Sequence, residues 1–188
     1  MGAKRGPADP ARRERILAAT ERILLAHGIA GLSHRAVARE ADVPLGSTTY
    51  YFATLDDLLD AATRELSERY ARWLRTWGEE LGEVTPAQLV EAVADLVQDQ
   101  LANAREELAL SYELLAAAMR RPELRDAALL YASSEAEVLS TKTDPATAEA
   151  LVRLLDGVLL QSLASSTPVS RAAITAPLAA LLTPRTPQ

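Results

Sequence analysis

One stretch of the chain limits the fold more than any other, because its apolar residues recur every three or four positions for more than twenty residues. This spacing puts them on one face of a continuous α-helix, which we expect to run from the capping residue Thr54 to about Glu80. Gly78 and Gly82 are expected to mark the following loop. A helix of this length, about 40 Å, can belong to two parts of the protein. The apolar positions are Leu55, Leu59, Ala62, Leu66, Tyr70, Trp73 and Trp77.

The composition favours helices in the rest of the chain as well. Alanine and leucine supply most of the 48 % apolar residues, whereas aromatic residues make up 4 %, and both alanine and leucine form helices better than strands. Capping residues, prolines and glycines divide the chain into about nine helices, so the predicted fold class is all-α. The expected helices cover residues 10–27, 33–40, 44–51, 54–80, 85–103, 105–120, 122–140, 144–164 and 170–182. Pro177 is expected to kink or split the last one.

Charge is distributed unevenly along the chain. Residues 1–52 contain eight basic and five acidic side chains, a net charge of +3, so the remainder carries −9 within the overall charge of −6. A basic head on an acidic body favours nucleic acid as the partner of the head. Chance clustering of surface charge is the alternative interpretation.

Several classes of protein are disfavoured. The lack of cysteine excludes disulfides and thiolate metal sites and favours a reducing cytoplasm. No secretory signal or membrane span is predicted. The two histidines, His27 and His34, lack a second histidine at metal-ligand spacing, so we expect no metal and no cofactor. An enzyme would have to use Tyr112, Glu113 or Asp156 without a histidine partner, so we expect that this protein is not an enzyme.

The segment Val43–Phe52 is the most informative short stretch. It places three small hydroxyl residues, a glycine and two adjacent tyrosines on one short helix. A core helix would not present so many hydroxyl groups, whereas a helix in the DNA major groove would use them on phosphates and base edges. Gly46 and Ser47 would let the backbone approach the bases. Three short helices joined by tight turns fit a helix-turn-helix.

This region resembles the TetR family of bacterial one-component repressors. The order and spacing hold from about Arg12 to Leu66. The matching pieces are Arg15-Ile16-Leu17-Ala18-Ala19, Ala26-His27-Gly28, Leu32-Ser33-His34-Arg35-Ala36-Val37-Ala38, Ala41-Asp42-Val43, Gly46-Ser47-Thr48-Thr49-Tyr50-Tyr51-Phe52 and Leu58-Leu59. Residues 120–124 and 155–159 are also similar to the family. The resemblance implies a DNA-binding head over residues 10–53 and a ligand-binding and dimerisation bundle over residues 54–183, flanked by a basic arm (1–9) and a short tail (184–188).

The resemblance also implies roles for individual residues. Ser33 falls where the family uses a hydroxyl on a phosphate, Arg35 where a side chain touches backbone or base, and Tyr51 where a phosphate-binding histidine is common. Ser47, Thr49 and Tyr50 fall on groove-facing positions, and His34 is expected to reach DNA. The full predicted DNA-binding set is Ser33, His34, Arg35, Leu45, Gly46, Ser47, Thr49, Tyr50 and Tyr51, with Lys4 and Arg5 from the arm.

The sequence departs from the family pattern at four positions. Leu45 and Leu55 stand where lysines are common, which removes two expected phosphate contacts and shifts electrostatic attraction to the arm. A merely solvated basic tail is the alternative for that arm. Asp42 replaces a turn glycine, which is tolerable because aspartate enters the left-handed region more readily than most residues. Thr48 replaces a core leucine.

The C-terminal part is expected to enclose a mostly apolar ligand pocket. Candidate pocket residues are the polar or aromatic ones that interrupt apolar helix faces, although core packing or exposure is the alternative for each. They are Trp73, Trp77, Tyr112, Met119, Tyr131, Asp156 and Gln161. Gly157 in mid-helix would allow a neighbouring helix or the ligand to approach closely.

The partners follow from this plan. We expect a homodimer through the eighth and ninth helices, because the eighth is apolar on two sides, and hence a near-palindromic double-stranded operator. An unidentified small molecule is expected to release the DNA. The alternative is a DNA-binding dimer whose larger domain docks a protein, or only dimerises, and binds no small molecule.

Overall fold

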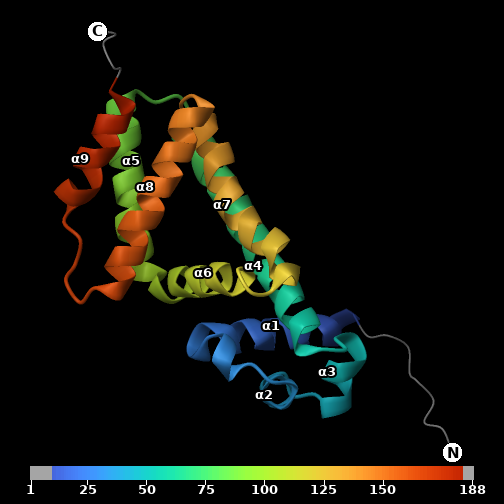
Figure 1. Cartoon of the computed structure of the whole chain (residues 1–188). Coiled ribbons are helices and arrows are strands. Elements are labelled where there is room, and N and C mark those ends of the chain that lie inside the picture. Colours follow the sequence, from blue (N-terminus) through green and yellow to red (C-terminus); the bar gives the residue numbers. More distant parts are fainter. Residues whose placement is uncertain (1–9, 184–188) are drawn as a thin grey trace, which may run out of the picture. The chain divides into compact units, whose positions relative to one another are not determined.

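The structure, a computed structural model, describes residues 10–183, and all regular structure within them is helical (Figure 1). This confirms the predicted all-α fold with nine α-helices in the described part of the chain. The elements are α1 (Pro10–His27), η1 (Ile29–Gly31), α2 (His34–Glu40), α3 (Leu45–Tyr51), α4 (Leu55–Leu81), α5 (Pro86–Asn103), α6 (Arg105–Ala118), η2 (Pro122–Leu124), α7 (Arg125–Ser140), α8 (Pro145–Ala164) and α9 (Arg171–Leu182).

The chain divides into two compact units between Leu66 and Ser67, which lie within α4. Unit 1 ends at Leu66 and unit 2 begins at Ser67. The sequence-based boundary at residues 53/54 lies just before this helix. The continuous α4 therefore contributes residues to both units, as expected from its periodicity.

Unit 1 is a small bundle in which α2 packs against α1 and α3. The turn between α2 and α3 uses Asp42 at φ 52°, the left-handed conformation that the sequence predicted. Gly28 ends α1 at φ 62°, and its N–H donates to the carbonyl of Leu24 over 2.8 Å. The buried hydrophobic residues of this unit are Ile16, Leu17, Ala19, Ile23, Leu24, Val37, Ala38, Ala41, Phe52, Leu58, Leu59 and Ala62.

Unit 2 is a larger helical bundle. Helix α5 packs against α8 and α9, while α7 packs against α6 and α8 (Figure 1). The main core lies between α5, α8 and α9 and includes Leu89, Val93, Val97, Leu151, Leu155, Leu159, Ile174 and Leu178. No helix within residues 10–183 has the length and apolar character that crossing a membrane requires.

Predicted capping residues begin four helices, one of which is α2, where Ser33 is the cap. At α4, the N–H of Asp57 donates to Thr54 Oγ1 over 3.0 Å, and the N–H of Thr54 donates to Asp57 Oδ2 over 2.9 Å. The same reciprocal pair joins Thr85 and Gln88 at α5, and Asp144 caps α8. Each cap satisfies a backbone N–H that has no partner inside its helix.

The buried face of α4 is offset from the apolar stripe that the spacing predicted. Leu55 and Trp73 are 37 % and 43 % exposed, whereas Ser67 is buried. Ala71, Leu74 and Gly78 continue this buried face. The prediction was wrong here because apolar residues were counted as inward, while the neighbouring helices require small side chains.

Gly78 shows this requirement most clearly. The sequence placed it in a loop, but it lies inside α4, and a Cβ atom there would come within 2.5 Å of Val138 Cγ1 on α7. Close packing of α7 on α4 therefore depends on a glycine at this position.

The C-terminal helices differ from expectation in two details. Helix α6 ends at Ala118, earlier than predicted, and Pro122 opens a 3-10 turn rather than α7 itself. Pro177 does not split the last helix: α9 runs without a break from Arg171 to Leu182 and contains this proline.

Candidate functional site

Helix α3 presents a polar surface in unit 1. Leu45 and Tyr50 are 47 % and 52 % exposed. Gly46 and Thr49 are also exposed, and Ser47 and Tyr51 are partly buried. A Cβ atom at Gly46 would meet nothing within 4 Å, so packing within the chain does not require a glycine there.

One threonine of α3 points into the core of unit 1 and helps to hold the helix in place. Thr48 is fully buried, as expected for a position that the family fills with leucine, and its hydroxyl donates to the carbonyl of Leu45 over 2.8 Å. At the end of the helix, the buried Phe52 lies under the guanidinium of Arg13, 5.4 Å from the ring centroid. These contacts hold one side of α3 so that Thr49 and Tyr50 face outward.

The predicted DNA-binding residues on α2 lie in different surroundings. Ser33 caps α2, with its hydroxyl accepting from the N–H of Ala36 over 3.1 Å, and Arg35 is exposed. Both ring nitrogens of His34 are buried and have no hydrogen-bond partner. The structure therefore brings Arg35, but not the His34 ring nitrogens, to the surface. Lys4 and Arg5 lie outside the described residues.

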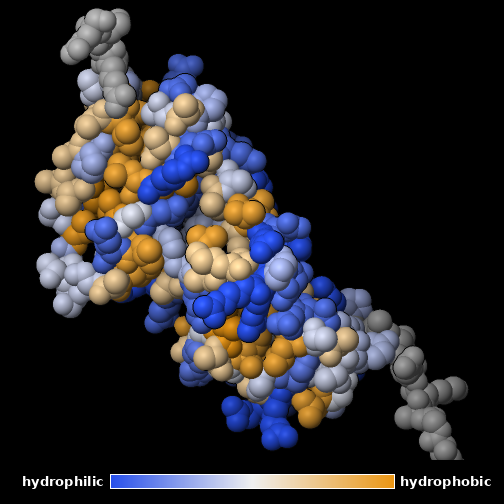
Figure 2. Space-filling view, viewed as in Figure 1, coloured by the Kyte–Doolittle hydropathy of each residue, from blue (hydrophilic) through white to orange (hydrophobic). Residues whose placement is uncertain are grey.

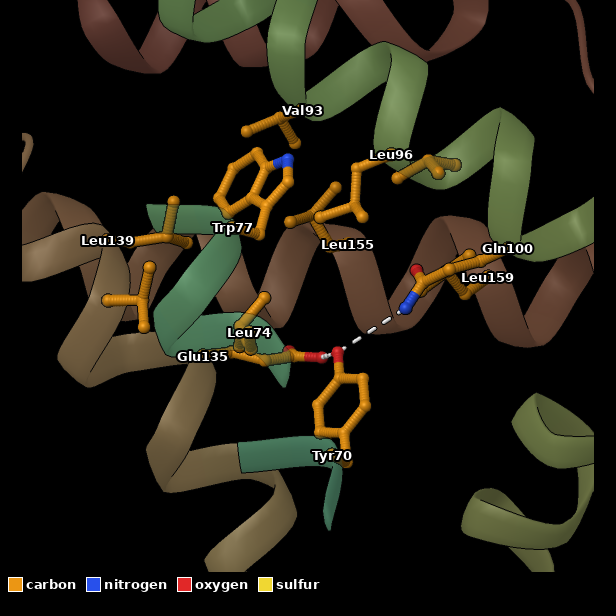
Figure 3. A pocket seen from close by; sticks show the side chains of 12 residues that line it. Tyr70, Leu74, Trp77, Val93, Leu96, Gln100, Glu135, Leu139, Leu155 and Leu159 are labelled. Carbon is orange, nitrogen blue, oxygen red and sulfur yellow. Dashed lines mark hydrogen bonds between the residues drawn. The ribbon is translucent and has the colours of Figure 1, made fainter. Parts of the chain in front are cut away.

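Unit 2 contains a cavity between α4, α5, α7 and α8 (Figure 3). The empty space between its lining atoms is about 400 Å³, part of which is open to solvent. Its lining is mostly apolar and consists of Tyr70, Leu74, Trp77, Val93, Leu96, Val97, Gln100, Glu135, Val138, Leu139, Leu155 and Leu159.

The polar groups of the cavity are connected to one another. The hydroxyl of Tyr70 donates to Glu135 Oε1 over 2.7 Å, and the amide nitrogen of Gln100 donates to the same hydroxyl over 3.4 Å (Figure 3). Glu135 is the one acid among the lining residues, and it forms no ion pair with a basic residue among those described.

Tyrosines extend this network beyond the lining. The rings of Tyr70 and Tyr131 are stacked, with centroids 3.8 Å apart and an angle of 8° between their planes. On the neighbouring helices, the hydroxyl of Tyr112 donates to Asp156 Oδ1 over 3.0 Å. Burial raises the pKa of all three tyrosines, with a further increase from the nearby carboxylates.

Burial also raises the pKa of Glu135, to about 7. The hydrogen bond from Tyr70 acts in the opposite direction by stabilising the ionised form, and the negative charge of Asp156 adds to the increase. Burial similarly raises the pKa of Asp156, against the hydrogen bond from Tyr112. The cavity thus contains a carboxyl group that changes charge near neutral pH.

The structure brings together only some of the predicted ligand residues. Trp77 lines the cavity, and Tyr131, Tyr112 and Asp156 belong to the network around it. Trp73 is exposed, although its ring lies 5.6 Å from that of Tyr70. Met119, which is 76 % exposed, and Gln161, which is also exposed, do not line the cavity.

Sequence reasoning missed Glu135 and Gln100 as cavity residues and treated Tyr70 only as core. A signal for Glu135 was present, because it lies four residues after Tyr131 and three before Val138 and therefore shares their helix face. Gln100 carried the same kind of signal, because it lies three residues after Val97 and four after Leu96 and therefore shares their helix face.

Two known sequence families match the chain. The family described as "Bacterial regulatory proteins, tetR family" matches residues 16–62, and "Tetracyclin repressor-like, C-terminal domain" matches residues 84–184. A curated relative, the HTH-type transcriptional regulator PksA of Bacillus subtilis (strain 168), is 41 % identical over 58 residues. That match covers 31 % of this chain and 28 % of PksA, so it spans little more than a quarter of the relative.

Solved structures match over nearly the whole chain. The multidrug binding protein EbrR complexed with ethidium is 46 % identical, with a TM-score of 0.81, and the match covers 93 % of this chain and 99 % of EbrR. EbrR structures with proflavin and with malachite green also match, at 43 % and 40 % identity. A TetR-family member from Streptomyces coelicolor A3, SCO1917, is 43 % identical, with a TM-score of 0.74 over 93 % of this chain and 99 % of that one. The chain therefore belongs to the TetR family of bacterial regulatory proteins.

Proposed function

We propose that this protein is a transcriptional repressor that binds operator DNA through α3 and is released when an aromatic cation enters the cavity of unit 2. The observation that carries the proposal is the combination of Glu135 with Tyr70 and Trp77 in one mostly apolar cavity. A carboxylate beside aromatic rings suits a ligand that is both flat and positively charged.

The surface of α3 supports the DNA-binding part. Its exposed Thr49 and Tyr50 provide hydroxyl groups for phosphates and base edges, and Gly46 leaves the backbone accessible. Ser33, Arg35, Ser47 and the partly buried Tyr51 are proposed as flanking contacts. Arm residues such as Lys4 and Arg5 would add attraction to phosphates that is independent of DNA sequence.

The ligand class is supported by the solved relatives. Three of the four ligands named with EbrR, namely ethidium, proflavin and malachite green, are aromatic cations, and the fourth is the small heterocycle imidazole. A buried carboxylate gains most from a partner of opposite charge when no basic side chain neutralises it. No described basic side chain neutralises Glu135, so we propose that this chain binds the same class of ligand.

We propose that the protein forms a homodimer through α8 and α9. Gly157, Leu160, Gln161 and Ala164 share an exposed face of α8, and Leu160 is 52 % exposed. A Cβ atom at Gly157 would meet nothing within 4 Å inside the chain, which leaves room for a partner helix. Hydrophobic residues gather over this side of unit 2 in Figure 2.

The exposed face of α9 has the same character. It consists of alanines, namely Ala172, Ala173, Ala176, Ala179 and Ala180. Small side chains let two helices approach closely. A two-fold dimer would then read a near-palindromic operator.

Helix α4 is proposed to couple the two activities. It contributes Leu58 and Leu59 to the core of unit 1 and Tyr70, Leu74 and Trp77 to the cavity lining. A ligand that displaces the cavity end of this helix, about 40 Å long, would favour a dimer whose heads do not match successive DNA grooves. DNA must then weaken ligand binding by the same factor.

The test is an electrophoretic mobility shift of DNA flanking the protein's own gene, with malachite green added at increasing concentration. Ethidium is less suitable because it intercalates in DNA. The wild type is expected to release the DNA, and Glu135→Gln to require at least about tenfold more ligand, since a charge contact is lost. Equal release from both proteins would contradict the proposed role of Glu135 in binding the dye.

The dimer is tested separately by sedimentation. Leu160→Glu is expected to shift the protein toward monomer at micromolar concentration, while Arg75→Glu, a charge reversal on an exposed residue of α4 outside the proposed interface, is the control. A wild-type protein that sediments as a stable monomer would contradict the proposed dimer.

A further inference from the structure

The carboxyl group of Glu135 lies in surroundings that penalise its charge. Apolar side chains form most of the cavity wall, including Leu74 from α4 and Leu139 on its own helix α7. Among the described residues, its carboxylate accepts one hydrogen bond, from Tyr70, and no basic side chain pairs with it. Ionising this group without a cation nearby is therefore costly.

The groups that face Glu135 from each packed helix do not remove this cost. Tyr70 on α4 donates a hydrogen bond, and Gln100 on α5 contributes a neutral amide that is bonded to Tyr70. Tyr112 on α6 and Tyr131 on α7 are neutral hydroxyl groups, and Asp156 on α8 is acidic. The negative charge of Asp156 favours the neutral form of Glu135.

A bound cation would reverse the balance. Its charge would replace the missing basic partner and favour the ionised carboxylate. The neutral form of Glu135 would therefore belong to the ligand-free protein and the ionised form to the protein with a bound cation. Burial already holds the pKa of Glu135 near 7, where a small change in surroundings alters its protonation.

We propose, on the basis of the proposed function, that Glu135 selects cationic ligands by exchanging its proton for them. The proton leaves the carboxyl group for the solvent, and the carboxylate that remains pairs with the cation. No other bond forms or breaks. The affinity for aromatic cations therefore rises with pH up to slightly alkaline conditions, and a cell whose interior becomes acidic loses sensitivity to the effector.

The first experiment titrates the DNA-free full-length protein with ethidium, whose charge is fixed over this pH range, and follows its fluorescence. With a pKa of about 7, the ionised fraction of Glu135 increases from about 9 % at pH 6 to about 91 % at pH 8. The affinity is expected to rise about tenfold between these values. A neutral aromatic compound should show no such increase.

The second experiment measures the proton directly by isothermal titration calorimetry with ethidium at pH 7, in two buffers of different ionisation enthalpy. The difference between the apparent enthalpies is expected to correspond to about 0.5 proton released per ethidium bound. This measurement uses the wild type alone, so it decides the proposal even if a variant fails to fold.

Two substitutions test whether Glu135 is the group that releases the proton. Glu135→Gln is expected to abolish proton release and the pH dependence, and Glu135→Asp to restore proton release in part. Glu137→Gln, which removes an exposed acid from the same helix, is the matched control and should behave as wild type. Circular dichroism checks that each variant is folded.

The outcomes separate the two proposals. Ethidium binding with equal affinity at pH 6 and pH 8 and without proton release would overturn the exchange at Glu135 but leave the cation pocket intact. Proton release that persists in Glu135→Gln would also overturn it. If ethidium does not bind at any pH, both the exchange and the proposed ligand class are wrong.

Discussion

The surface of α3 and the cavity of unit 2 both carry hydroxyl and aromatic groups, but different partners satisfy them. On α3, the rings of Tyr50 and Tyr51 pack edge to face, 5.1 Å apart, and Tyr50 remains 52 % exposed. In the cavity, Tyr70 stacks on Tyr131 and donates to Glu135. On α3, the polar groups remain available to a large partner such as DNA. In the cavity, the polar groups are bonded to one another as long as no small ligand is bound.

This difference has an energetic consequence. Substitutions on the α3 surface should change binding and leave stability nearly unaffected, because exposed side chains contribute little to the core. Substitutions around the cavity should change stability as well, because its polar groups are buried or partly buried and are hydrogen-bonded to one another. The four predictions below test this contrast, from the largest expected effect to the smallest.

The largest effect is expected on DNA binding. Tyr50→Ala should weaken specific operator binding by roughly 1–3 kcal/mol, about fivefold to 150-fold, with little change in melting temperature. The buried neighbour Thr48 provides the contrast, because Thr48→Ala removes a hydroxyl bonded to Leu45 and should lower the melting temperature. A Tyr50 variant that melts early would show that this side chain belongs to the core.

The second prediction concerns the packing of α4 on α7. Gly78→Ala places a Cβ atom 2.5 Å from the Cγ1 of the stiff, buried side chain of Val138. We expect a loss of about 1–3 kcal/mol of unfolding free energy, as for other overpacked cores, measured by urea denaturation. An unchanged denaturation midpoint would mean that α7 can move away at no cost.

The third prediction concerns pH and stability in the absence of ligand. The pKa of Glu135 in the folded protein, about 7, lies above the ordinary value of 4.5, so the folded state binds more protons between these values. Its contribution to stability is therefore present below about pH 4.5 and is lost as the pH rises through 7. Glu135→Gln should be more stable than the wild type at pH 8, by on the order of 1–2 kcal/mol, and the difference should shrink at pH 5. Thermal melts at both values provide the comparison, and a variant that is less stable at pH 8 would contradict it.

The smallest effect is expected at a second glycine. Gly46→Ala adds a methyl group that meets nothing within 4 Å, inside a helix where alanine is favoured over glycine. Unfolding free energy should rise by less than about 1 kcal/mol, whereas operator affinity should fall because the methyl group faces the DNA. Opposite stability changes for Gly46→Ala and Gly78→Ala would support the contrast between the two regions, and a stability loss at Gly46 would weaken it.

The sequence by itself determined the all-α fold, the start of each capped helix and the position of the hydroxyl-rich helix α3. These features depend on short-range chemistry: Thr54 with Asp57, Thr85 with Gln88, and the left-handed Asp42 each involve residues close together in the chain. The hydroxyl-rich α3 was identified in the same way, because exposure of one face of a short helix follows from its own residues.

Only the tertiary structure decided which residues form the cavity. Tyr70, Gln100 and Glu135 come from α4, α5 and α7, and they meet because those helices pack together. Helical periodicity shows which residues share a face but not what lies opposite it, so Trp73 and Met119 were predicted to face a pocket and are exposed instead. The charge behaviour of Glu135 has the same origin, since its pKa depends on burial by neighbouring helices rather than on adjacent residues.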